Sequence, residues 1–287
     1  MDSEKKWLKN KAMIIMLAVI IIAASLILPG LNNGLVVRNY TIDSPDIGEP
    51  INIALVTDLH SCDYGNGQQE LIAEIDSQKP DFIALSGDIF DDVLDNANTE
   101  AFISSIAGRY PCYYVTGNHE YYNGTAAFRK KMGILEKYDI PILSGSCETI
   151  TINGETLNIC GVDDPYARKF AGELGYTGME SQLEAALSAA DNGNFTILLS
   201  HRPELFDTYQ EHGFDLVLSG HAHGGQWRIP GILNGLYAPD QGLFPDYAGG
   251  KYSAGGTTMI VSRGLAREST RIPRIYNPPE LVMIEII

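Results

Sequence analysis

The stretch INIALVTDLH, residues 51–60, has a pattern that recurs along the first half of the sequence. It begins with β-branched and apolar residues, as a buried strand does, and ends in a polar cluster. DFIALSGD at 81–88 and PCYYVTGN at 111–118 follow the same pattern, and the intervening segments 66–79 and 98–109 are predicted to be helices. This alternation predicts an α/β layered fold with polar side chains gathered at the carboxyl ends of the strands.

The second half of the sequence predicts further strands of a different arrangement. CETITINGETLNICGVDD at 147–164 alternates around Asn153-Gly154, which indicates a hairpin. FTILLSHRP at 195–203 and FDLVLSGHAH at 214–223 are again apolar runs with polar ends, and two more apolar strands follow in the tail. We therefore predict an α/β (α+β) fold: a four-layer αββα sandwich of two mixed sheets flanked by helices.

The N-terminus has the composition of a membrane anchor. No charged residue occurs between Ala12 and Leu28, a run that would reach ~26 Å as a helix, at the short end of what spans a bilayer. Lysines precede this run and favour a cytoplasmic start. We predict a transmembrane helix within residues 1–33 and one globular domain at 34–287, in a single-pass protein of the cell membrane whose domain is extracytoplasmic. A cleaved signal peptide is the alternative.

The charge balance limits the partners. The chain has 36 acidic against 20 basic residues and a formal net charge of −16. Such a surface repels polyanions, so we expect no binding to duplex nucleic acid. The charge does not exclude small anionic substrates. The four cysteines show no CxxC spacing. They are predicted as buried small apolar residues, with disulfides as the alternative.

Histidines concentrate at the predicted strand ends. Five of the six lie there, together with carboxylate and amide side chains, and only His212 lies elsewhere. Imidazole and carboxylate ligands suit Zn, Mn or Fe, and a carboxylate can bridge two cations. Two metal ions ~3.5–4 Å apart can share a hydroxide and neutralise both oxygens of a displacement at phosphorus. The strand-end residues are Asp58, His60, Asp88, Asn118, His119, His201, His221 and His223.

These residues and their order resemble the calcineurin-like metallophosphoesterase superfamily. Its pattern runs D-x-H, G-D-x-x-D, G-N-H-E/D, a lone H, and G-H-x-H. The segments GLYAPDQGLFPDYAGGKY and NPPELVMIEI are similar to its membrane-anchored bacterial branch, which is related to phosphodiesterases and UDP-diacylglucosamine pyrophosphatases. The motifs are here Asp58-Leu59-His60, Gly87-Asp88-Ile89-Phe90-Asp91, Gly117-Asn118-His119-Glu120, His201, and Gly220-His221-Ala222-His223.

The resemblance implies two divalent metal ions (Mn, Fe, Zn or Co) with Asp88 as their bridge. His119 would stabilise the transition state or protonate the leaving oxygen. Asp91 would orient His119 or its loop, with a helix cap as the alternative, and Glu120 would be a supporting partner. The implied ligands of one ion are Asp58, His60, Asp88 and His223, and those of the other are Asp88, Asn118, His201 and His221.

The resemblance predicts an enzyme, a metal-dependent phosphoesterase. It would cleave a phosphodiester, pyrophosphate or phosphomonoester by attack of a hydroxide that bridges the metals, and a small-molecule or lipid-linked phosphate ester is the expected substrate. Arg263 and Arg202 are candidate phosphate contacts, because a guanidinium can bind two phosphate oxygens. A protein phosphatase of the same fold and a non-catalytic binding scaffold are the alternatives.

Overall fold

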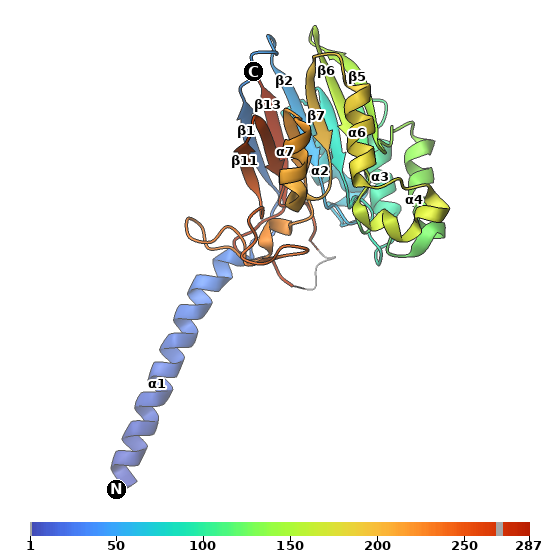
Figure 1. Ribbon diagram of the computed structural model, residues 1–287. Helices are drawn as coiled ribbons and strands as arrows, with labels where there is room; N and C mark the ends of the chain where they lie inside the picture. The colour runs from blue at the N-terminus through green and yellow to red at the C-terminus, as the bar shows by residue number, and fades with distance from the viewer. Residues whose placement is uncertain (1, 268–271) are drawn as a thin grey trace.

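Two mixed β-sheets form the centre of the fold, and helices cover their outer surfaces (Figure 1). The computed structural model describes residues 2–267 and 272–287. The predicted sandwich of two mixed sheets with flanking helices is confirmed. A separate two-stranded sheet pairs β9 (Tyr237–Ala238) with β10 (Gly242–Leu243).

The first sheet has the strand order β1-β13-β2-β3-β4. β2, β3 and β4 run parallel, while β13 runs antiparallel to β2 and parallel to β1. The sheet therefore joins strands from the start of the domain to the last strand of the chain. Its strands are β1 (Val36–Ile42), β2 (Ile51–Val56), β3 (Phe82–Ser86), β4 (Cys112–Val115) and β13 (Glu280–Ile286).

The second sheet has the order β11-β12-β8-β7-β6-β5. Its four central strands are parallel, and an antiparallel strand closes each edge. Asn153 and Gly154 form the predicted turn between β5 and β6 with φ of 54° and 93°, the sign that a type I′ hairpin requires. The strands are β5 (Ser146–Ile152), β6 (Glu155–Gly161), β7 (Phe195–Leu199), β8 (Leu216–Ser219), β11 (Gly250–Ala254) and β12 (Thr257–Val261).

The helices form the two outer layers. One apolar cluster joins the first sheet to α2, α3 and α4, and another joins the second sheet to α6 and α7. The longer helices are α2 (Gln69–Gln78), α3 (Ala97–Ile106), α4 (Gly124–Lys137), α6 (Met179–Ala189) and α7 (Phe206–His212). The short ones are η1 (Leu28–Leu31), η2 (Asn66–Gln68), η3 (Pro165–Phe170), α5 (Ala171–Leu174), η4 (Pro203–Leu205) and η5 (His223–Gly225).

Strand β2 shows why a strand between two layers carries apolar side chains on both faces. Ile53 and Leu55 belong to the cluster between the two sheets, whereas Ala54 and Val56 belong to the cluster under the helices. Successive side chains of a strand point to opposite faces, so a strand covered on both sides is apolar throughout. The side chains within β2 therefore pack between layers, and the polar residues that follow β2 can take part in catalysis.

Helix α1 (Asp2–Ile27) extends away from the two sheets in Figure 1. Its uncharged part, from Ala12 to Ile27, is about 24 Å long, shorter than the ~30 Å hydrocarbon core of a bilayer. Within residues 2–267 and 272–287, no helix combines the length and apolar character that a membrane crossing needs, so the predicted transmembrane helix is not supported.

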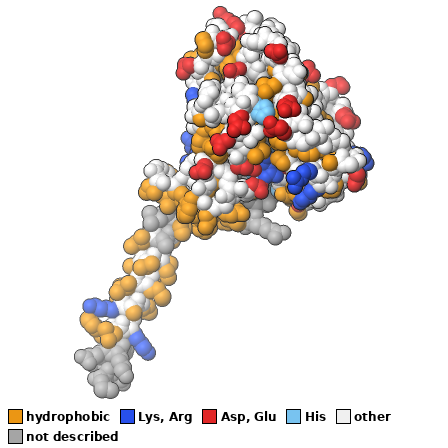
Figure 2. All heavy atoms as spheres, in the orientation of Figure 1, with side chains coloured by type: hydrophobic (Ala, Val, Ile, Leu, Met, Phe, Trp, Pro, Cys, Tyr) orange, Lys and Arg blue, Asp and Glu red, His pale blue; other side chains and the backbone are white. Residues whose placement is uncertain are grey.

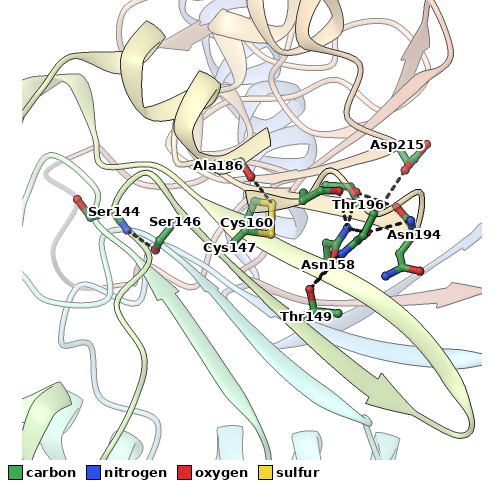
Figure 3. The surroundings of a disulfide bond; sticks show 12 residues. Ser144, Ser146, Cys147, Thr149, Asn158, Cys160, Ala186, Asn194, Thr196 and Asp215 are labelled. Carbon is green, nitrogen blue, oxygen red and sulfur yellow. Dashed lines mark hydrogen bonds between the residues drawn. A yellow bond between two sulfur atoms is a disulfide. The ribbon is translucent and has the colours of Figure 1, made fainter. Parts of the chain in front are cut away.

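Two of the four cysteines form a disulfide, although all four were predicted to be buried, unbonded residues. Cys147 of β5 and Cys160 of β6 face each other in the strand register and form a disulfide (Figure 3). Cys62 and Cys112 are buried thiols, as predicted. The spacing of the cysteines could not show the pair, because it arises from the register of the hairpin.

Candidate metal centre

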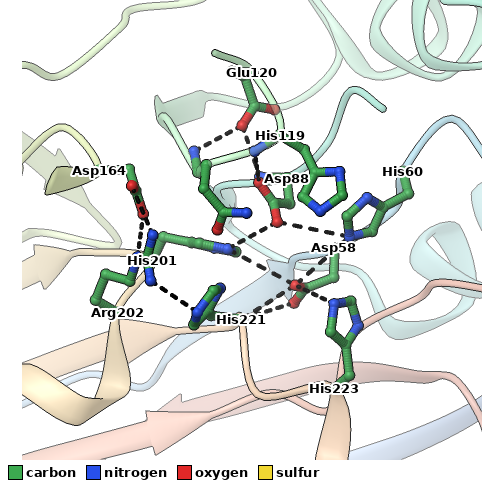
Figure 4. A network of polar contacts seen from close by, with 12 residues as sticks. Asp58, His60, Asp88, His119, Glu120, Asp164, His201, Arg202, His221 and His223 are labelled. Atoms are coloured by element: carbon green, nitrogen blue, oxygen red, sulfur yellow. Dashed lines mark hydrogen bonds and ion pairs between the residues drawn. The ribbon is translucent and has the colours of Figure 1, made fainter. Parts of the chain in front are cut away.

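The parallel strands place the predicted ligands at one edge of the two sheets. Asp58 and His60 follow β2, Asp88 follows β3, and His201 and His221 follow β7 and β8. Figure 4 shows these side chains converging from both sheets on one region. Of the groups whose ligand atoms lie within 4.8 Å of one another, three consist of these strand-end residues: Asp58, His60 and His223; Asp88, His201 and His221; and His60, Asp88 and His119.

Unpartnered atoms at the centre fit a metal site. Several buried nitrogen and oxygen atoms of the predicted ligands have no hydrogen-bond partner, although burying such an atom without a partner costs about 1–3 kcal/mol. A cation bound by these atoms would offset that cost, so the donor set fits metal ions. These atoms include Nε2 of His60, Oδ1 of Asn118 and Nδ1 of His223, while Oδ2 of Asp88 and Nε2 of His201 contact each other at 3.1 Å.

Neighbouring groups orient three of these ligands. Nδ1 of His60 lies 3.1 Å from Oδ1 of Asp91, and Nδ1 of His201 lies 2.9 Å from the carbonyl of Ser86. Such contacts on one ring nitrogen leave the other free to bind a metal. The amide of Asn118 donates to the hydroxyl of Tyr122 at 2.6 Å, which turns the amide oxygen toward the centre.

Asp88 lies between the two groups of histidines. Its Oδ2 is 3.1 Å from Nε2 of His201 and 3.7 Å from Nε2 of His60. Burial by itself would raise the pKa of Asp88, but His201 and His119 hold it well below the usual value. Asp88 is therefore ionised at neutral pH and has the position that a bridging carboxylate needs.

The histidines of the centre differ in protonation. Burial opposes the charge on His201, but Asp88 raises the pKa of His201 to about 10. Burial lowers the pKa of His223 to about 3, so this ring is neutral at pH 7. A metal binds neutral imidazole, so His201 would have to release its proton when a metal binds.

The backbone at the centre adopts an uncommon conformation. Five predicted ligands have positive φ, a region that residues other than glycine seldom occupy. Strain of this kind persists only where the surrounding structure imposes it, and it clusters at functional sites. The residues are Asp58 (49°), His60 (48°), Asp88 (52°), His221 (67°) and His223 (46°).

Position 220 has room only for glycine. A Cβ at this position would overlap the carboxylate of Asp58 and the side chain of Thr57. The main chain before His221 can therefore pass close to β2 only because residue 220 has no side chain. Its neighbour His221 donates its backbone N–H to Asp58 at 3.1 Å, which joins the two sheets at the centre.

His119 lies beside the ligands, and its nearer carboxylate partner is Asp92, to which the sequence analysis gave no role. Its Nδ1 is 2.7 Å from Oδ1 of Asp92 and 3.5 Å from Oδ1 of Asp91. Asp91 instead contacts His60 and accepts the backbone N–H groups of Val93 and Leu94 at 2.9 and 2.8 Å. Asp91 thus holds its loop and a predicted ligand, and it caps no helix, because α3 begins only at Ala97.

Glu120 fastens the loops that carry the ligands. Its carboxylate accepts the backbone N–H of Gly117 at 2.7 Å and those of Asp88 and Phe90 at 3.1 Å. Burial and nearby Asp88 raise the pKa of Glu120. This is the supporting role that the sequence predicted.

The two predicted phosphate contacts lie in different surroundings. Nη1 of Arg202 is 2.9 Å from Nε2 of His221, and the guanidinium pairs with Asp164 and Asp240. Arg202 therefore borders the centre. Arg263 is bound to Glu280 at 3.0 Å, an ion pair that joins it to strand β13, so a phosphate contact by Arg263 is not supported.

Sequence reasoning missed several supporting residues. Asp92, Tyr122 and Asp240 each contact His119 or a predicted ligand. Asp92 directly follows the GDIFD motif, and Tyr122 follows the GNHE motif after one residue, so both lie next to recognised segments. Asp240 belongs to the segment GLYAPDQGLFPDYAGGKY, whose resemblance gave no role for this aspartate, and the fold brings it to His221.

Comparison with known proteins gives the family. The family model described as calcineurin-like phosphoesterase matches residues 51–225. An uncharacterized metallophosphoesterase of Aquifex aeolicus is 31% identical over 87% of this chain and 91% of its own length. Another from Helicobacter pylori J99 is 28% identical over 84% of this chain, but the chain spans only 61% of that relative.

Solved structures share the fold. The NAD nucleotidase of Haemophilus influenzae superposes with a TM-score of 0.54 at 15% identity, over 76% of this chain and 46% of that one. A 5′-nucleotidase precursor from Thermus thermophilus gives 0.50 at 14% identity, over 76% and 49%. At these identities the likeness concerns the fold alone. The family match and the curated relatives show that this chain belongs to the calcineurin-like phosphoesterase family and is a metal-dependent phosphoesterase.

Proposed function

We propose that the centre holds two divalent metal ions and cleaves phosphodiester or pyrophosphate bonds. The unpartnered buried atoms on both sides of Asp88 carry this proposal. Asp58, His60 and His223 would hold one ion with Asp88. Asn118, His201 and His221 would hold the other, again with Asp88.

The chain's own groups suit transfer at phosphorus. Bound metals would supply Lewis acidity and lower the pKa of a water nucleophile. Burial lowers the pKa of His119, but Asp88, Asp91 and Asp92 raise it to about 9, so the ring is protonated at neutral pH. A protonated His119 can donate its proton to the oxygen of the leaving group.

An apolar cavity supports a lipid-linked substrate. It measures about 630 Å³, and two residues of its lining, Trp227 and Leu236, donate their backbone N–H groups to the carbonyl of Gly225, the last residue of η5. Its lining includes Trp227, Ile229 and Leu233. A space of this size and character can take hydrocarbon chains attached to a phosphate on the metals.

The disulfide supports a location outside the cytoplasm. The bond between Cys147 and Cys160 would persist in an oxidising compartment, whereas cytosolic thiols are normally kept reduced. We therefore keep the extracytoplasmic location of the domain, with its boundaries at 34–287, as part of the proposal.

Hydrolysis by the purified full-length chain tests the function. Each of Mn, Fe, Zn and Co would be supplied in turn, with bis-p-nitrophenyl phosphate, p-nitrophenyl phosphate, a lipid pyrophosphate and a phosphopeptide as substrates. Loss of a residue that only supports a metal ligand typically lowers activity by at most about 100-fold. Asp88 is the predicted ligand of both ions, so we expect diesterase or pyrophosphatase activity to fall by more than that in Asp88→Asn. Asp191→Asn, which changes an exposed carboxylate, is the control.

Metal content separates the outcomes. Wild type should retain two metal ions per chain and Asp88→Asn fewer. A preference for the phosphopeptide would favour a protein phosphatase. Full metal content without hydrolysis of any of the four substrates would contradict the proposed catalytic role.

A further inference from the structure

One lysine of helix α4 is buried beside the centre. The residue Lys131 is 2% exposed, whereas the adjacent Lys130 is exposed. In Figure 2, acidic side chains are spread over the visible face of the body, and basic ones gather low on it. Removing a cation from water costs free energy unless other groups compensate for the loss, so the burial of Lys131 indicates a specific role.

Lys131 binds the backbone of the loop that carries His119. Its Nζ donates to the carbonyl oxygen of His119 at 2.7 Å and to that of Glu120 at 3.4 Å. An ammonium group has three N–H donors, so one lysine can hold both carbonyls. These contacts fasten the loop between β4 and α4 to the helix that follows it.

The backbone of His119 is held on both sides. Its N–H donates to Oδ1 of Asp88 at 2.8 Å, and its carbonyl accepts from Lys131. The ring has a separate partner in Asp92, at 2.7 Å. The position of the imidazole relative to Asp88 therefore depends on a stretch of chain that is anchored before and after it.

Four carboxylates of the centre favour the charge of Lys131. Burial holds the pKa of Lys131 below its usual value, although Glu120, Asp88, Asp92 and Asp91 raise it. The effect is mutual, because Lys131 opposes the rise in the pKa of Glu120 that burial and Asp88 cause. Lys131 thus balances part of the negative charge that the loops of the centre bring together.

We propose that Lys131 is a positioning residue for the catalytic acid, because it fixes the carbonyl of His119 and so keeps the imidazole directed at the leaving group. Its side chain is buried, so it acts through His119 and not on the substrate. The inference rests on the proposed function, in which His119 donates a proton to the leaving oxygen. It adds a residue that lies outside the recognised motifs.

Hydrolysis of two diesters by the full-length chain with bound metal tests this role. Methyl phenyl phosphate and methyl p-nitrophenyl phosphate share the methyl group, but phenolate is the more basic leaving group and depends more on the acid. For Lys131→Met we expect kcat to fall about 100-fold with the phenyl ester, the lower end of what an acid contributes, and at most about 10-fold with the p-nitrophenyl ester. KM should change less than kcat for both esters.

Lys130→Met is the matched control, because it removes the neighbouring exposed cation, and its rates should match those of wild type. Thermal melting and metal content check that each variant is folded and loaded. If Lys131→Met does not fold, Lys131→Gln takes its place. Glutamine is polar but uncharged and too short to hold both carbonyls, so the same selective loss is expected.

A double variant tests whether Lys131 acts through His119. His119→Ala should itself be slow with the phenyl ester. Adding Lys131→Met should lower kcat no further, because the residue that Lys131 positions is already absent. Equal losses with the two esters in Lys131→Met, or a further loss in the double variant as large as that in the single one, would overturn the proposed role.

Hydrogen exchange separates this inference from the proposed function. Exchange of the backbone N–H groups of 117–121, measured by mass spectrometry, needs no turnover. It should be faster in Lys131→Met than in wild type and Lys130→Met. Unchanged exchange would overturn the positioning role even if wild type hydrolyses both esters. Faster exchange confined to Lys131→Met would support that role even if wild type hydrolyses neither.

Discussion

Oδ1 of Asp92 lies 2.7 Å from Nδ1 of His119, closer than Asp91, whose carboxylate oxygen is 3.5 Å from the same nitrogen. Asp91 accepts the backbone N–H groups of Val93 and Leu94. Among the described residues, the side chain of Asp92 accepts no backbone N–H. The adjacent aspartates therefore have different tasks. Asp91 supports His60, and Asp92 holds the imidazole of His119.

Replacing Asp92 by Asn should change the pH dependence of hydrolysis. Burial lowers the pKa of His119, and Asp88, Asp91 and Asp92 together raise it to about 9. An acid that must be protonated loses activity as pH rises through its pKa, so the wild-type rate should fall above pH 9. Removing the charge of Asp92 should move this falling limb down by about 1 unit. The measurement is kcat for bis-p-nitrophenyl phosphate from pH 6 to 10.

Asp95→Asn is the matched control for this prediction. Asp95 is exposed in the same loop, and its side chain accepts the N–H of Ala97, a contact that asparagine can retain. Its pH profile should match that of wild type. An unchanged alkaline limb in Asp92→Asn would show that Asp92 does not tune His119.

Gly220→Ala should weaken metal binding and stability. The added methyl group would overlap the carboxylate of Asp58 and Thr57, so β8 and β2 would have to separate. Overpacking of this kind typically costs ~1–3 kcal/mol. Metal titration and chemical denaturation would detect the two effects.

Gly172→Ala provides the comparison. No atom lies within 4 Å of a Cβ built at Gly172. This variant should bind metal as wild type does. If Gly220→Ala behaved like Gly172→Ala in both measurements, the close approach of the two sheets would not matter for the site.

The sequence predicted the metal ligands better than the residues that hold those ligands in place. Asp58, His60 and Asp88 could be found because parallel strands deliver polar residues to one edge of a sheet, and a strand's apolar run marks where it ends. Whether Asp91 or Asp92 faces His119 depends on the path of a loop without regular hydrogen bonds, which residue order does not determine.

Pairings across the fold were harder to predict. Arg263 meets Glu280 because β13 returns from the end of the chain to the first sheet beside β2. Cys147 meets Cys160 through the register of one hairpin. Neither pairing is visible in the residues beside Arg263 or in the spacing of the four cysteines.

Reduction of the disulfide should lower stability without abolishing the site. The bond closes a short loop of sequence separation 13, for which the chain-entropy estimate is about 3 kcal/mol. We expect a reductant to lower the melting temperature of wild type. The double variant Cys147→Ser with Cys160→Ser should already melt lower and should not respond to reductant. A response in that variant would assign the effect to Cys62 or Cys112 instead.

Metal binding should raise the stability of the whole domain. Asp58 and Asp88 are both buried, their pKa values are lowered, and they face the same centre, so their like charges repel in the absence of a cation. An ion that binds only the folded chain stabilises it by about 2.7 kcal/mol at 100 times its dissociation constant. The melting temperature should therefore rise with added Mn²⁺ and fall with a chelator. In Asp88→Asn the rise should be much smaller, because the carboxylate shared by both groups of ligands is lost. An equal rise in this variant would mean that the stabilising ion binds elsewhere.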